Sequence, residues 1–185
     1  MIERLNKWDR ELFVYLNSLG IEEYDNFWIF VTNIKHWIPL YIFFFVLFFI
    51  AFHKKKALFN SAFLLSSFLT TLAFTNFVKG IAARLRPNND PELLDIIRIL
   101  QTPTNYSFFS GHASSSFVVT TFVVLSLREK YKWIYLVYIW PITFVLSRVY
   151  VGVHYPLDLL VGAIVGLIFG YIFYQLYKLT GKRFY

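Results

Sequence analysis

The sequence predicts an all-α fold: a polytopic bundle of about five transmembrane helices, with six as the alternative count, preceded by an N-terminal amphipathic helix. Only 16% of the 185 residues are charged, whereas soluble domains carry about 25%. Hydrophobic residues make up 57% of the chain and aromatic residues 22%, which is too apolar for a disordered protein. Five stretches are also long and apolar enough, or nearly so, to cross a hydrocarbon layer that takes about 20 helical residues.

The expected spans are separated by polar segments along the chain. Two of them are short, and flanking residues such as Phe108 and Phe109 can lengthen them. The apolar run Phe27–Ile34 can extend the first span if Lys35 and His36 lie at an interface. The five spans are expected at Trp37–Phe52, Ala57–Val78, Ala113–Leu127, Trp133–Ser147 and Leu159–Tyr177.

The N-terminal segment 1–20 is predicted to be an amphipathic helix. Charges interrupt it before any apolar core develops, so it does not match a signal peptide. Two interpretations stay open: an interfacial helix lying on the membrane, or a helix packed against the end of the bundle. Its apolar face would be Leu5, Trp8, Leu12, Phe13, Tyr15 and Leu16. We see no internal repeat or linker and treat 1–185 as a single integral-membrane domain.

The positive charge of the chain predicts its orientation. The formal net charge is +7, and in a membrane protein we interpret this excess as a topology signal, with no nucleic-acid partner expected. Three basic segments follow alternate spans: 53–56, 128–132 and 178–183. The positive-inside rule places them, and the C-terminus, in the cytoplasm of a multi-pass protein of the cell (inner) membrane. Segments 79–112 and 148–158 then share the outer, or periplasmic, face.

Those two outer segments contain three polar clusters. They are Lys79–Pro87 at the end of the second span, Ser107–His112 at the start of the third, and Ser147–Asp158 between the fourth and fifth. Each cluster alone has an ordinary explanation: Lys79 and Arg86 can snorkel to headgroups, a Ser-Gly-His can simply begin a helix, and a lone histidine can pack at an interface. Charges near membrane depth are expensive, however, and are usually paired or functional.

Taken together, the clusters predict an anion site of phosphate type. Lys79, Arg86 and Arg148 supply three cations with no matching excess of acids, and arginine forks suit phosphate oxygens. Ser110 and Gly111 lie at a helix N-terminus, where free N–H groups and the helix dipole favour an anion. Gly111 allows close backbone approach. Ser110 can donate to the phosphate or simply cap the helix.

Two histidines add reactive groups to this anion site. One neutral imidazole can attack phosphorus, and a second, protonated imidazole can protonate the leaving oxygen. Asp158 follows His154 by four residues, so on a continuing helix its carboxylate can orient that imidazole. No carboxylate cluster is spaced for Mg²⁺, and three nearby cations disfavour zinc on His112, His154 and Asp158. The chain has no cysteine, so a thiolate site is excluded; we expect no metal and no cofactor.

The motifs in 79–158 closely resemble those of the type-2 phosphatidic acid phosphatase family, relatives of the vanadium haloperoxidases. Lys79 to Arg86-Pro87 and Ser147-Arg148 to His154 and Asp158 match the family pattern, and Phe109 departs from it where the family has proline. The resemblance implies that His154 is the nucleophile, Asp158 its orienting partner and His112 the general acid. It implies phosphate binding by Lys79, Arg86, Ser110, Gly111 and Arg148.

This resemblance implies a metal-independent lipid phosphatase that works through a phosphohistidine. The family acts on undecaprenyl diphosphate, phosphatidylglycerol phosphate, phosphatidic acid and lipid A phosphates, and an outward-facing site favours undecaprenyl diphosphate. Two rivals remain: a lipid phosphotransferase, and a non-catalytic anionic-lipid-binding or transport protein. The expected partner is a lipid phosphate in the bilayer, and no oligomeric state is predicted.

Two expectations concern elements outside the motifs. Family members commonly have six spans, and here the amphipathic segment takes the place of the first, which puts the N-terminus on the outer side. Residues 92–100 suit a short helix half-buried at the interface, guarding lipid access; the alternative is a structural loop that covers the site.

Overall fold

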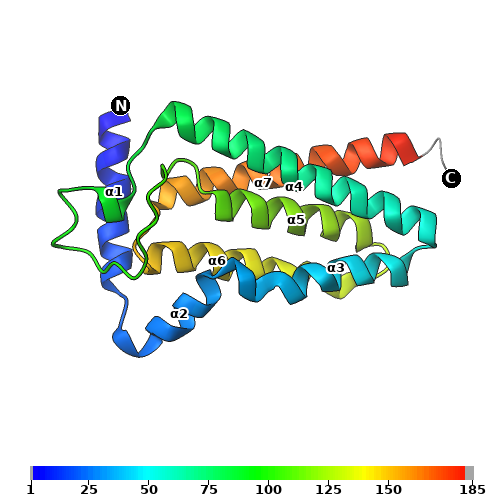
Figure 1. Ribbon diagram of the computed structural model, residues 1–185, viewed down its shortest axis with the longest axis horizontal. Coiled ribbons are helices and arrows are strands. Elements are labelled where there is room, and N and C mark those ends of the chain that lie inside the picture. The colour runs from blue at the N-terminus through cyan, green and yellow to red at the C-terminus, as the bar shows by residue number, and fades with distance from the viewer. Residues whose placement is uncertain (1, 182–185) are drawn as a thin grey trace.

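The computed structural model describes residues 2–181, which form a bundle of antiparallel helices with no strand in that range (Figure 1). The helices are α1 (Ile2–Ser18), α2 (Asp25–Thr32), α3 (Ile38–Ala51), α4 (Lys54–Ala82), α5 (Gly111–Leu127), α6 (Ile139–Tyr150) and α7 (Pro156–Gly181). Short 3-10 turns are η1 (Glu22–Tyr24), η2 (Ile34–Trp37), η3 (Pro87–Asn89) and η4 (Lys132–Tyr138). The prediction of an all-α polytopic bundle is confirmed.

Five helical stretches match the five expected spans. Four are long and apolar enough to cross a membrane: Ile34–Ala51, Lys54–Asn89, Lys132–Tyr150 and Pro156–Gly181. The fifth, α5, has 17 residues, which corresponds to about 26 Å of helix. Its shorter length suits its position, because α5 packs against α3, α4, α6 and α7 and most of its residues are buried inside the bundle.

Helix α7 approaches α5 closely along a row of three glycines, Gly162, Gly166 and Gly170. A Cβ atom on Gly166 would lie 2.6 Å from the backbone oxygen of Ser114 and 2.7 Å from the Cβ of Phe117. Small residues let membrane helices pack backbone against backbone. The α5–α7 contact matters for function because both helices carry site residues in their first turns.

We therefore expect Gly166→Ala to destabilise the bundle by about 1–3 kcal/mol, because the added methyl group must push α7 away from α5. The measurement is the thermal unfolding temperature in detergent micelles. Gly80→Ala on α4 is the matched control, since a Cβ there meets nothing within 4 Å. Equal unfolding temperatures for the two variants would contradict this packing account.

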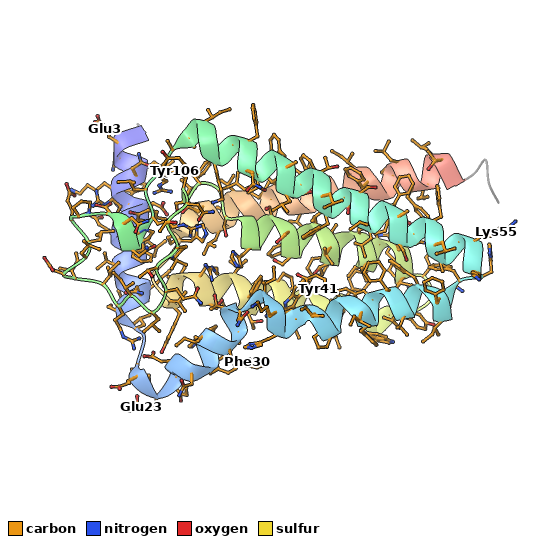
Figure 2. All side chains as sticks on the ribbon, viewed as in Figure 1. Glu3, Glu23, Phe30, Tyr41, Lys55 and Tyr106 are labelled. Atoms are coloured by element: carbon orange, nitrogen blue, oxygen red, sulfur yellow. The ribbon has the colours of Figure 1, made fainter. Side chains whose placement is uncertain are left out.

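The basic segments and the polar clusters lie at opposite ends of the bundle. Lys55 marks one end, whereas Glu3, Glu23 and Tyr106 lie at the other (Figure 2). The loop after α5 and the end of α7 reach the Lys55 end as well (Figure 1). The charges Lys182 and Arg183 of the basic tail lie outside the described residues. The alternation predicted from the loops therefore agrees with the helix directions.

Helix α1 lies across the polar end of the bundle, roughly perpendicular to the spans (Figure 1). Phe13 is fully buried and packs edge-on against Tyr155, with ring centroids 5.4 Å apart. Leu5, Trp8 and Leu12 are exposed on another side of the helix. The expected single apolar face was thus wrong in detail: Phe13 and Leu16 pack toward the bundle, while Leu5, Trp8, Leu12 and Tyr15 form an exposed stripe.

Two further segments differ from expectation. Phe27–Ile34 does not extend the first span, because α2 ends at Thr32. The next residue, Asn33, has an extended backbone, and its side-chain oxygen accepts from Lys35 N to start a separate turn. Residues 91–97 form turns and a bend with no regular helix, and Leu93 is buried in a small core with Phe13 and Tyr155. The short helix expected over 92–100 is therefore wrong, and the segment is a loop whose Leu93 packs against Phe13 of α1 and Tyr155.

Candidate active site

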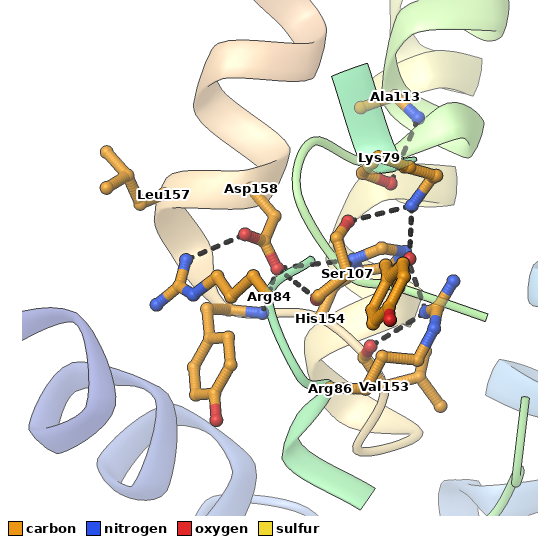
Figure 3. Close-up of polar contacts among 12 residues, drawn as sticks. Lys79, Arg84, Arg86, Ser107, Ala113, Val153, His154, Leu157 and Asp158 are labelled. Carbon is orange, nitrogen blue, oxygen red and sulfur yellow. Dashed lines mark hydrogen bonds and ion pairs between the residues drawn. The ribbon is translucent and has the colours of Figure 1, made fainter. Parts of the chain in front are cut away.

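All eight residues predicted for the site lie at the polar end of the bundle, on four converging elements. Lys79 is in the last turn of α4, which ends at Ala83 in the left-handed conformation (φ 44°). Arg86 follows on extended backbone. Ser110, Gly111 and His112 begin α5, Arg148 is in the last turn of α6, and His154 and Asp158 flank the start of α7. Figure 3 shows how several of these side chains meet.

His154 is fully buried and is held at both ring nitrogens (Figure 3). Its Nδ1 lies 3.3 Å from Oδ2 of Asp158 and 3.2 Å from Oγ of Ser107. Its Nε2 lies 2.9 Å from Nη1 of Arg86, which can only donate. The ring is therefore oriented as the neutral tautomer that carries its proton on Nδ1, with the Nε2 lone pair facing Arg86.

Burial and, after it, the positive charge of Arg86 lower the pKa of His154 well below its ordinary value of 6.5. The imidazole is consequently neutral at physiological pH. A neutral imidazole with an accessible lone pair is the nucleophilic form of histidine.

Asp158 accepts hydrogen bonds from several groups of the site. Its carboxylate is fully buried, and Oδ1 accepts a hydrogen bond of 2.7 Å from Nη1 of Arg84. Oδ2 accepts from the backbone N–H of Tyr155 at 3.1 Å and from the hydroxyl of Ser107. A buried carboxylate with this many donors is fixed in orientation, as an orienting partner of histidine requires.

The three predicted cations are buried and have only neutral partners. Nζ of Lys79 donates to the backbone oxygens of Tyr106 (2.6 Å) and Ser107 (2.8 Å). Arg86 donates to the backbone and side-chain oxygens of Asn105 at 2.7 and 2.8 Å. None of the three forms an ion pair among the described residues. Buried charges are costly without a counter-charge, so this arrangement is suited to binding an anion.

Arg148 shows the same shortage of partners most clearly. Nη1 donates to the hydroxyl of Thr32 and to Oε1 of Gln101, the latter at 3.1 Å. Its Nε is buried without a hydrogen-bond partner. One donor of this guanidinium is therefore left to an incoming acceptor.

His112 lies next to this cation cluster in the first turn of α5. Its ring packs 5.2 Å from that of Phe144, and it interacts electrostatically with Arg148, His154, Arg86 and Lys79. Its ring nitrogens form no hydrogen bond with the described residues, so they are free to exchange a proton with substrate.

Ser110 is the N-cap residue of α5. Its Oγ accepts from the backbone N–H of Ala113 at 3.4 Å, and its own N–H donates to the backbone oxygen of Asp158 at 3.0 Å. The cap role is thus observed directly. Gly111 follows as the first helical residue, where N–H groups have no partner within the helix.

Sequence analysis missed several residues that hold the site together. Arg84 and Ser107 lie inside the recognised clusters, so their positions beside Arg86 and His112 were a usable signal. Asn105 and Gln101 lie on the covering loop, and Asp9 lies far away on α1, where no local pattern marks them. Among the described residues, no group of three or more His, Cys, Asp or Glu side chains is placed to hold a metal ion.

The family model of the PAP2 superfamily matches residues 60–182, which contain all eight site residues. The chain belongs to the PAP2 superfamily. It is 32% identical to the lipid A 4'-phosphatase of Bacteroides thetaiotaomicron over 98% of this chain and 83% of that protein. It is 38% identical to the undecaprenyl-diphosphatase of Sulfolobus acidocaldarius, over 56% of this chain and 48% of that protein.

The fold agrees with that of a solved PAP2 enzyme. The PAP2-type phosphatidylglycerolphosphate phosphatase from Bacillus subtilis superposes with a TM-score of 0.74, covering 97% of this chain and 87% of that one at 20% identity. With its apolar spans and its PAP2 membership, this chain is a membrane-embedded lipid phosphatase and therefore a hydrolase.

Proposed function

We propose that this PAP2 protein transfers the phosphoryl group of a lipid phosphate first to Nε2 of His154 and then to water. The observation that carries the proposal is that Arg86 faces Nε2 of His154, on the side opposite Asp158, while Lys79 and Arg148 are buried near it and none of the three cations is paired with a carboxylate. Pure anion binding would need the cations but not an oriented neutral imidazole. The motif-bearing region 79–158 is in this proposal the catalytic part of the single domain.

In the first step, the Nε2 lone pair of His154 forms a bond to phosphorus while the bond from phosphorus to the lipid oxygen breaks. His112 gives its proton to that leaving oxygen. Arg86, which donates to Nε2 in the free protein, turns its N–H groups to the phosphate oxygens. Asp158 stabilises the positive charge that the phosphorylated ring of His154 acquires.

In the second step, a water molecule attacks the phosphorus of phosphohistidine. His112, now neutral, accepts a proton from that water, the nitrogen–phosphorus bond breaks and inorganic phosphate leaves. Lys79, Arg86 and Arg148, with the hydroxyl of Ser110 and the N–H group of Gly111, hold the non-bridging oxygens in both steps. Fixed positive charge of this kind is often the largest contribution to stabilising a transition state, and it requires no metal or cofactor.

The proposed setting is the outer face of the cell membrane. The basic segments at the other end of the bundle support a cytoplasmic location for that end by the positive-inside rule. The N-terminal helix α1 and the site then lie at the periplasmic surface. The exposed stripe Leu5, Trp8 and Leu12 supports an interfacial position for α1, where apolar side chains contact the headgroup boundary.

Among lipid phosphates, a phosphorylated glycolipid of the lipid A class is the preferred substrate. The lipid A 4'-phosphatase aligns with nearly the whole chain, including α1 and the loop that covers the site. Undecaprenyl diphosphate, which orientation alone had favoured, is the second candidate, because the undecaprenyl-diphosphatase aligns with about half of the chain. Phosphatidylglycerol phosphate and phosphatidic acid complete the candidate set.

The test is inorganic phosphate release by the purified protein from these four lipids in mixed micelles, with and without a chelator. We expect the highest kcat/KM for lipid A 4'-phosphate and no effect of chelation. A preference for any of the other three lipids would overturn the substrate assignment, and loss of activity on chelation would overturn the metal-free mechanism. Labelled phosphate appearing on a second lipid instead of in solution would identify a phosphotransferase, and phosphate binding without turnover would identify a binding protein.

A further inference from the structure

Helix α1 reaches the active site through one buried acid, Asp9. Its side chain is only 4% exposed, although α1 lies across the end of the bundle. Oδ2 accepts a hydrogen bond of 2.6 Å from Nη2 of Arg84, and Oδ1 accepts one of 2.8 Å from the backbone N–H of Leu157 in the first turn of α7. One carboxylate thus contacts both an arginine of the site and the helix that carries Asp158.

Arg84 in turn connects two carboxylates. Nη1 binds Oδ1 of Asp158 at 2.7 Å (Figure 3), and Nη2 binds Asp9. The guanidinium also lies 4.1 Å from the ring centroid of Tyr155. The other carboxylate oxygen of Asp158 faces Nδ1 of His154. These contacts form a continuous chain from α1 to the histidine.

We propose that Asp9 is a positioning residue for catalysis: acting through Arg84, it fixes the carboxylate of Asp158 and so the orientation of the His154 ring. This inference rests on the proposed role of His154 as nucleophile. It assigns the N-terminal helix a part in the chemistry, although the PAP2 family match begins only at residue 60.

Arg84 needs the carboxylates of both Asp9 and Asp158 to stay in place. Without Asp9, the guanidinium keeps only Asp158 as a charged partner and can rotate toward solvent, because one ion pair restrains fewer of its five N–H donors. Asp158 then loses a fixed donor at Oδ1. A small rotation of its carboxylate changes the direction in which Nε2 of His154 points, and misplacement by about 1 Å can cost about 100-fold in rate.

Burial of Asp9 itself has a cost that this role explains. Burial is the largest influence on this carboxyl and raises its pKa, and the hydrogen bonds from Arg84 and Leu157 oppose that rise. A residue needed only to attach α1 would not require a buried charge, because Phe13 and Asn17 on the same helix already pack or hydrogen-bond to the bundle.

The experiment is a double-mutant cycle of Asp9→Asn and Arg84→Gln in the full chain, with the kinetics of phosphate release as readout. Asparagine retains an acceptor for the Leu157 N–H but loses the ion pair. We expect kcat to fall about tenfold in each single variant with KM nearly unchanged, and little further fall in the double variant. Glu11→Gln, an exposed acid on the same helix, is the charge-matched control and is expected to retain wild-type kcat.

The outcomes separate this inference from the proposed function. Additive losses across the cycle, a changed KM with normal kcat, or an equal loss in Glu11→Gln would each overturn the positioning role of Asp9. Thermal unfolding in detergent shows whether Asp9→Asn folds. If it does not, Arg84→Lys provides the same test, because the single ammonium group of lysine replaces the guanidinium that binds both Asp9 and Asp158. Retained activity in His154→Ala would instead overturn the proposed function, whatever the cycle shows.

Discussion

His154→Ala is expected to abolish phosphate release from every lipid phosphate, with kcat lower by at least about 10³-fold. The reason is that the variant has no group at the position of Nε2 that can form a bond to phosphorus. Asp158 orients the ring so that the Nε2 lone pair has a fixed direction, and Arg86 lies next to Nε2. The measurement is phosphate release in detergent, together with a chemical quench that detects the acid-labile phosphohistidine in wild type and its absence in the variant.

The control for this prediction is His53→Ala, a histidine at the opposite end of the bundle, which should retain wild-type kcat. A pH profile adds a second check. Because burial and Arg86 lower the pKa of His154, protonation removes its lone pair only in acid, and the acid limb of kcat/KM should lie below pH 6.5. Undiminished turnover in His154→Ala would sink the covalent mechanism.

His112→Asn is expected to lower kcat on lipid phosphates by about 10²–10⁴-fold, the usual contribution of a general acid. A lipid alkoxide leaves poorly without a proton. An aryl phosphate such as p-nitrophenyl phosphate carries a leaving group that departs without one, so its first step should lose much less. The measurement is rapid-mixing kinetics of nitrophenol and phosphate release by the variant.

The same variant should accumulate phosphohistidine from the aryl phosphate, because the attacking water no longer has His112 as its base. Nitrophenol then appears as a burst that approaches one equivalent per active site, followed by slow turnover. Phe144→Leu, which alters the packing of the His112 ring and leaves the imidazole in place, is the control and should show no such burst. Equal losses on the lipid and aryl substrates would show that His112 does not act as the acid.

The spans, and the three clusters that contain the eight residues predicted for the site, could be picked out from the sequence because their signals are local. Each span is a run of apolar residues, and each cluster places its charged or reactive side chains within about a dozen positions of one another. His154 and Asp158 are a good example, since a spacing of four residues determines that they share a helix face. The PAP2 motifs added roles to residues that the spacing had already selected.

Contacts between distant segments could not be found in this way. Arg84 binds Asp9 across 75 positions, Arg148 contacts Thr32 across 116, and Asn17 holds the backbone at Val149 across 132. The amphipathic pattern of 1–20 predicted a helix, but it did not show that Phe13 would turn inward while Leu12 stayed exposed. Which side of this helix is buried depends on the residues that pack against it, and the hydropathy pattern of the helix contains no information about those residues.

The amino-acid sequence is enough to predict that the chain spans a membrane and which charged residues lie near membrane depth, because both follow from the free-energy cost of placing each residue type in hydrocarbon. Which of these charges pair with one another depends on the tertiary structure. It pairs Arg84 with Asp9 and Asp158 and leaves Lys79, Arg86 and Arg148 with neutral partners. The physical reason is that Coulomb energies depend on distances of a few ångströms, which arise only when α1, α4, α6 and α7 meet at one end of the bundle.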